Sequence, residues 1–153
     1  MLVYRITLAK WSTLLTASGS AARWNSNGRF MLYTASTRAL ACLENVVHRK
    51  SIGRDDFFKI MVIDVPDDLK TEQIALKDLP PDWTAYANYA KCQAIGDNWL
   101  NGGTTAILKT PSSIIAEEYN YLLNPQHPDF KRLSIHAIEN FSFDERLVPK
   151  ARS

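Results

Sequence analysis

Residues 30–48 read FMLYTASTRALACLENVVH, and this stretch decides the fold class. Its first part, Phe30 to Thr34, is short and apolar and predicts a β-strand. After Ser36, which we expect to cap a helix, apolar residues recur at helical spacing as far as about His48. Glu44 shares this apolar face with Leu40, so we expect its carboxylate at the edge of the buried stripe.

Strands outnumber helices on both sides of this stretch. The patterns predict strands over 2–8, 57–65, 74–76, 105–109, 133–138 and 140–143, and one further helix over 84–100 with a break at Gly96. Residues 119–129 contain two prolines and are expected to be mostly irregular. Because strands and helices do not alternate strictly, the sequence favours an α+β fold over a doubly wound sheet. The 153 residues show no repeat or linker and predict one domain over 1–153.

Composition excludes several classes of protein. With 46% apolar and 22% charged residues, the chain is neither disordered nor a low-complexity scaffold. No run of 18 apolar residues predicts a membrane-spanning helix. Two cysteines are too few for a disulfide framework or a thiolate zinc site. The apolar N-terminal stretch is broken by Ser12, Thr13 and Thr16, unlike a secretory signal, so we expect a cytoplasmic protein.

Charge is distributed unevenly along the chain. Residues 1–54 contain eight Lys/Arg and one acid, Glu44, for a net charge of +7, whereas the whole chain has a net charge of +2. This asymmetry suggests that an anion meets the N-terminal third. The anion is nucleic acid, a phosphorylated small molecule or an acidic partner; alternatively, the two parts of the chain neutralise each other in the fold.

The sequence motifs of several common enzyme classes are absent. The chain has no GxGxxG, P-loop, HExxH, GxSxG or CxxC sequence. None of the three histidines has a second histidine or cysteine at ligand spacing, so we expect no metal site. We interpret His48 as a capping cation, His127 as a structural turn residue and His136 as an ordinary strand residue.

Three local clusters remain as candidates for a site. Arg23 stands in a small-residue loop beside Trp24, where it either grips a phosphate or is solvated. Glu44 pairs either with a ligand hydroxyl or with a structural cation. Ser112 follows Pro111 at a strand end and belongs either to a site or to an ordinary turn.

In this order, the three clusters resemble the RES domain family, the toxin halves of RES–Xre toxin–antitoxin modules, named for an Arg, a Glu and a Ser. The resemblance covers nearly the whole chain, in blocks at 4–5, 18–28, 32–35, 39–44, 79–83, 95–100, 111–112, 120–128 and 143–147. The chain departs from the family at Ala21-Ala22, where glycines are common, and at Ser26-Asn27, where prolines are common. These changes affect loop flexibility and remove no functional group.

The resemblance implies a single RES domain with a fold similar to ADP-ribosyltransferases, in which mixed or antiparallel sheets are flanked by helices. It implies a toxin that cleaves NAD⁺ at the nicotinamide–ribose bond by hydrolysis or phosphorolysis, with inorganic phosphate as co-substrate. The alternative within the family is ADP-ribosyl transfer to a specific protein. NAD⁺ is the substrate and no other cofactor is implied. The expected partner is an Xre-type antitoxin that occludes the site within an oligomeric complex and alone contacts DNA.

The resemblance also implies roles for individual residues. Arg23 holds the pyrophosphate, with Trp24 and Asn25 beside it in the NAD-binding loop. Tyr33 stacks on the nicotinamide. Glu44 accepts a hydrogen bond from the ribose 2′-OH and stabilises the positive charge that grows as nicotinamide leaves. Ser112 orients the ribose or the carboxamide.

Two functions of other classes stay open at this point. A nucleic-acid-binding module would use the basic N-terminal third together with Trp11, Trp24 and Tyr33 for base stacking. A metal-free ribonuclease built on His and Arg is the other alternative, although the histidines are scattered along the chain.

Overall fold

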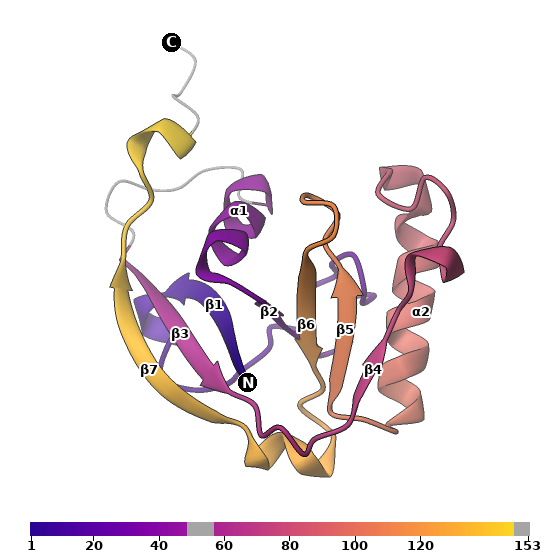
Figure 1. Ribbon diagram of the computed structural model, residues 1–153, viewed down its shortest axis with the longest axis horizontal. Helices are drawn as coiled ribbons and strands as arrows, with labels where there is room; N and C mark the ends of the chain where they lie inside the picture. The colour runs from indigo at the N-terminus through magenta and orange to yellow at the C-terminus, as the bar shows by residue number, and fades with distance from the viewer. Residues whose placement is uncertain (49–56, 149–153) are drawn as a thin grey trace.

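The computed structural model describes residues 1–48 and 57–148, in which seven strands form one sheet. The strand order is β4-β5-β6-β2-β1-β3-β7; β4 and β5 are parallel and all other neighbours are antiparallel. The strands are β1 Leu2–Leu8, β2 Leu32–Ala35, β3 Phe58–Asp64, β4 Thr71–Gln73, β5 Ile107–Pro111, β6 Tyr119–Leu123 and β7 Ser134–Phe141. The α-helices are α1 Arg38–His48 and α2 Tyr89–Gly102 (Figure 1). The predicted α+β fold is confirmed.

Both α-helices lie on the same face of the sheet. Leu40 of α1 packs against Ile60 of β3, and Trp99 of α2 packs against Leu122 of β6. Tyr33 of β2 lies on that face between the two helical clusters, because it is paired with Leu122. The opposite face carries a separate core of alternate residues: Val3, Leu32, Met61, Ile63, Ile107 and Leu123. The two helices therefore flank the middle of the sheet, where β1, β2 and β6 meet (Figure 1).

Strands β1 and β2 pair over a very short stretch. The register joins Tyr4 to Ala35, and no second pair between these two strands is formed in the described residues. Beyond this pair the strands diverge, although each continues as a strand. The divergence leaves side chains of both strands facing a space that α1 and the loop of residues 18–24 enclose.

Helix α1 is capped one residue later than expected and begins at Arg38. The side chain of Thr37, rather than Ser36, accepts the backbone N–H of Leu40 at 3.1 Å. Both residue types can cap a helix, so sequence alone does not choose between neighbours. The helix otherwise covers the predicted segment and ends at His48.

Helix α2 runs without a break through Gly96. A side chain at this position would place its Cβ 1.7 Å from the backbone oxygen of Trp24. The glycine therefore permits close approach of the loop that carries Arg23 and does not interrupt the helix. This packing fixes the loop against α2.

Three strand predictions were wrong in detail. Residues 119–129 were expected to be irregular, but Tyr119–Leu123 form β6 between β5 and β2. The expected strand at 74–76 lies instead at Thr71–Gln73, paired with β5. The two strands expected at 133–138 and 140–143 are one strand, β7 (Ser134–Phe141). Pairing with neighbours on both sides decides the conformation of β6, and a single-sequence pattern does not contain that information.

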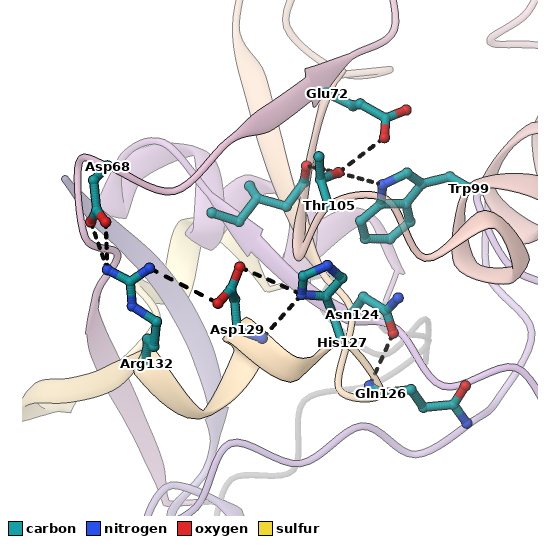
Figure 2. A network of polar contacts seen from close by, with 10 residues as sticks. Asp68, Glu72, Trp99, Thr105, Asn124, Gln126, His127, Asp129 and Arg132 are labelled. Carbon is teal, nitrogen blue, oxygen red and sulfur yellow. Dashed lines mark hydrogen bonds and ion pairs between the residues drawn. The ribbon is translucent and has the colours of Figure 1, made fainter.

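A polar network ties together the end of the sheet where β4 begins (Figure 2). Arg132 binds both carboxylate oxygens of Asp68, at 2.8 and 2.6 Å. Trp99 donates its indole N–H to Thr105, which donates to Glu72. His127 accepts the backbone N–H of Asp129 and so caps the turn of residues 128–132, which confirms its predicted structural role.

Candidate functional site

A cavity of about 660 Å³ lies between α1, the divergent strands and the loop of residues 18–24. Cavities of this size take a drug-sized or cofactor-sized ligand. Its walls come from five parts of the chain: β1, residues 18–24, β2, α1 and the facing ends of β5 and β6. The predicted site residues Arg23, Trp24, Tyr33 and Glu44 are among those that line it.

Glu44 is the acidic residue among those lining the cavity. The side chain of Asn120 donates to Glu44 Oε1 at 2.7 Å, and Ser112 Oγ donates to the same oxygen at 3.2 Å. His48 Nε2 lies 3.2 Å from the other oxygen, Oε2. Burial alone would raise the pKa of Glu44, but these hydrogen bonds outweigh it and hold the pKa below its ordinary value. Glu44 is therefore a carboxylate at neutral pH.

Arg23 lines the cavity but is held firmly by the protein. Its Nη1 and Nη2 donate to the backbone oxygens of Trp83 and Thr84 at 3.0 and 3.1 Å. Its guanidinium also lies over the rings of Trp83 and Tyr89, at 5.5 and 4.9 Å from their centroids. These contacts fix the guanidinium and use part of its donor capacity.

The neighbours of Arg23 organise its loop. Asn25 is 1% exposed, and its amide donates to the backbone oxygens of Ser20, Ser26 and Arg29. The Tyr33 hydroxyl donates to Asn25 Oδ1 at 2.6 Å and accepts the backbone N–H of Trp24 at 3.1 Å. Tyr33 thus joins the sheet to the loop through its hydroxyl, and it is also one of the residues that line the cavity. Asn25 is not among the lining residues.

Ser112 supports Glu44 at the end of β5. It is 5% exposed, and its hydroxyl accepts the backbone N–H groups of Ile114 and Ile115 while donating to Glu44. The structure thus brings together the Glu and Ser positions of the three sequence clusters. The Arg position, Arg23, lies on the wall of the same cavity.

Arg5 is a site residue that the cluster analysis missed. It lines the cavity from β1 and makes no hydrogen bond or ion pair with any residue that the structure describes. Burial lowers the pKa of Arg5 to about 10, so the guanidinium stays charged at neutral pH. A largely buried cation without a protein counter-ion is a favourable place for an anionic ligand. An arginine inside the apolar strand LVYRITL was the available signal.

Asn120 and His48 are two further residues around Glu44. Asn120 stood in a stretch expected to be irregular, and its register on β6 places it beside α1. Its Oδ1 is buried and has no partner in the described part of the chain. His48 was interpreted as a capping cation, whereas its ring contacts Glu44 and lines the cavity.

The described arginines of the basic N-terminal third include two that line the cavity and one that forms an ion pair. Arg5 and Arg23 face the cavity, and Arg38 pairs with Glu139 of β7 at 2.6 Å. Arg38 is thus neutralised within the fold, whereas Arg5 and Arg23 line the cavity; Arg49, Lys50 and Arg54 lie outside the described residues. His136 is a strand residue, as predicted, and its side chain is exposed. Residues 1–48 and 57–148 contain no cluster of three or more metal-ligating side chains.

Comparisons with known proteins identify the family of the chain. The RES domain family matches residues 2–144. The chain is 39% identical over 131 residues to the Prs ADP-ribosylating toxin of Sphingobium sp. (strain YBL2), which covers 84% of this chain and 81% of that protein. It is 32% identical over 152 residues to Toxin Res of Yersinia enterocolitica, covering 96% of this chain and 99% of that protein.

A solved structure shows the same fold at low sequence identity. A chain of the crystal structure of the M. tuberculosis MbcT–MbcA toxin–antitoxin complex superposes with a TM-score of 0.76 at 17% identity. The match covers 92% of this chain and 84% of that one. No helix in the described residues is both long and apolar enough to cross a membrane. With a family match from residue 2 to residue 144, the chain belongs to the RES domain family.

Proposed function

We propose that this protein is the toxin of a toxin–antitoxin pair and that it cleaves NAD⁺ at the nicotinamide–ribose bond. The observation that carries the proposal is the juxtaposition of Arg5 and Glu44 on the walls of one cavity. Arg5 is a largely buried cation without a counter-ion in the described residues, and Glu44 is a carboxylate held by three side chains. NAD⁺ presents a diphosphate to the first and a ribose to the second.

Cleavage of the nicotinamide–ribose bond requires few groups besides a cation for the diphosphate and a carboxylate beside the ribose. When the glycosidic bond breaks, its electron pair goes to the pyridinium nitrogen, and nicotinamide leaves as a neutral molecule. Positive charge then develops on the ribose, as in other glycosidic cleavages. A fixed carboxylate stabilises that charge more strongly in the transition state than in the ground state. Because the leaving group is neutral, no general acid is needed.

The remaining residues suit supporting roles. Arg5 and Arg23 supply two positive charges for the diphosphate, and Arg23 is fixed in place by Trp83 and Thr84. Tyr33 lines the cavity and offers a surface for the nicotinamide. Ser112, with Asn120, acts on the ribose through Glu44 and holds the carboxylate in one orientation.

A second reaction on the same site is ADP-ribosyl transfer to a protein. The relative from Sphingobium is named as a Prs ADP-ribosylating toxin, and this relationship favours transfer as the alternative outcome. Both reactions release nicotinamide in the same way and differ in the acceptor, which is water, phosphate or a protein side chain. The product therefore distinguishes them.

The proposed partner is an Xre-type antitoxin that occludes the cavity, within an oligomeric complex in the cytoplasm. Two observations support an occluding protein. A chain of similar fold is found in a toxin–antitoxin complex, and the cavity has one fixed and one unpaired arginine that an acidic segment would neutralise. Contact with DNA would then be made through the antitoxin.

The test is product identification after expression and after purification. Induction of the chain without an antitoxin should lower cellular NAD⁺. Purified protein should release nicotinamide, together with ADP-ribose in water or ADP-ribose 1″-phosphate when phosphate is present; a mass shift on another protein would indicate transfer instead. If NAD⁺ stays intact under all of these conditions and no protein gains ADP-ribose, the proposal is wrong.

A further inference from the structure

His48 lines the cavity, one helical turn after Glu44 on α1. The two residues lie four positions apart on α1, so they share a face and are separated by about 6 Å along the helix axis. His48 Nε2 lies 3.2 Å from Glu44 Oε2. The Glu44 side chain is 20% exposed and that of His48 is 52% exposed. The imidazole is therefore the more solvent-accessible of the two groups.

The contact with Glu44 determines which imidazole nitrogen is basic. Glu44 is a carboxylate and can only accept hydrogen bonds, and its Oε1 is already bound by Asn120 and Ser112. His48 Nε2 must then carry a proton to make a favourable contact with Oε2. In the neutral ring, the lone pair is left on Nδ1, as in other carboxylate–histidine pairs.

Few groups on the cavity walls are able to take up a proton near neutral pH. The titratable side chains among the described lining residues are Tyr4, Arg5, Arg23, Tyr33, Glu44 and His48. Arginines stay protonated, and phenols keep their proton near neutral pH. Glu44 is a weak base because hydrogen bonds lower its pKa. Neutral imidazole has a nitrogen lone pair that accepts a proton, and His48 is the imidazole among these residues.

We propose that His48 is the general base that activates the acceptor of the ADP-ribosyl group. This inference rests on the proposed cleavage of NAD⁺. As the bond from ribose C1′ to nicotinamide breaks, a lone pair of the acceptor oxygen forms the new bond to C1′. The acceptor's proton passes to His48 Nδ1 and from there to solvent. The acceptors that need this base are water and a hydroxyl-bearing protein side chain; an anionic acceptor, phosphate included, needs none.

The test is competition between two acceptors. Purified protein is incubated with NAD⁺ in water containing sodium azide, and nicotinamide, ADP-ribose and the azide adduct are measured together. Azide carries no proton, whereas water must lose one. The informative variant is His48→Gln, whose side-chain amide can still donate to Glu44 but cannot take up a proton. The matched control is His136→Gln, at an exposed position on β7 far along the chain.

We expect His48→Gln to raise the ratio of azide adduct to ADP-ribose by about tenfold or more, because general base catalysis contributes about 10²–10⁴-fold. His136→Gln should match wild type in both the product ratio and the rate of nicotinamide release. A product ratio unchanged in His48→Gln would overturn the role of His48 while leaving NAD⁺ cleavage intact. Absence of nicotinamide release from wild type would overturn both.

Discussion

Replacing Asn120 by alanine removes the shortest of the three hydrogen bonds that hold the Glu44 carboxylate. Asn120 donates at 2.7 Å, whereas the contacts of Ser112 and His48 with Glu44 are both 3.2 Å. The variant should fold, since Asn120 Oδ1 has no partner in the described part of the chain and its loss leaves no donor unpaired. The change therefore acts on Glu44 alone.

The size of the expected shift in the pKa of Glu44 follows from the free energy of the hydrogen bond that Asn120 donates. A hydrogen bond to a charged acceptor contributes about 1.5–3 kcal/mol, and 1.36 kcal/mol corresponds to a tenfold change in a protonation equilibrium. Hydrogen bonds to the carboxylate lower the pKa of Glu44, so removing one raises it. Because the carboxylate is the active form, activity is lost as pH falls through this pKa. The acid limb should move upward by about one pH unit or more.

The assay is the initial rate of nicotinamide release as a function of pH across the acidic and neutral range. The control is Asn140→Ala, which removes the same side chain from an exposed position on β7, where it contacts Lys59. An acid limb in Asn120→Ala that coincides with wild type, in a protein with an unchanged circular dichroism spectrum, would refute the assigned role of Asn120.

Three further predictions concern the walls of the cavity. Arg5→Met should lower kcat/KM for NAD⁺ by about 10- to 100-fold, because a charged hydrogen bond contributes about 1.5–3 kcal/mol; unchanged kinetics would exclude Arg5 from substrate binding. Gly96→Ala places a Cβ 1.7 Å from the Trp24 backbone oxygen. It should lower the free energy of unfolding by about 1–3 kcal/mol in urea titrations, whereas Gly102→Ala, with open space around it, should change it little. Tyr33→Phe should cost about 1–3 kcal/mol of stability, since it leaves the Trp24 N–H unpaired; equal denaturation midpoints would contradict this.

The sequence predicted the parts of the fold that carry strong local patterns. Residues 2–8 and 58–64 form strands because apolar and β-branched residues make up most of each, and α1 follows its helical spacing closely. Strand β6 was missed because YNYLL contains an asparagine and two partly exposed tyrosines. Only pairing with β2 and β5 makes this segment a strand.

Only part of the site was predicted, because some of its contacts join residues that are far apart in the sequence. Glu44 was assigned to the edge of the buried stripe on α1, and it lies there, 20% exposed. Arg23 and Ser112 were recognised through their order along the chain. Asn120 and His48 could not be assigned to Glu44, because Asn120 reaches it across 76 residues of sequence and His48 resembled a helix cap.

Arg5 shows the limit of local reasoning most clearly. Alternation along 2–8 predicts a strand but does not reveal that β1 and β2 share a single residue pair. The space opened by their divergence gives the guanidinium its place on the cavity wall. Charge asymmetry indicated an anion in the N-terminal third, and the structure shows which two arginines face the cavity.

The most direct test of the account is the rate of nicotinamide release by purified wild-type protein and by Glu44→Gln. Glutamine keeps the size of the side chain and removes its charge; Glu145→Gln, at an exposed position, is the matched control. We expect Glu44→Gln to release nicotinamide about 100-fold or more slowly than wild type and Glu145→Gln to be unaffected. Release by Glu44→Gln at the wild-type rate would show that the carboxylate does not stabilise the developing charge and would contradict the proposed mechanism.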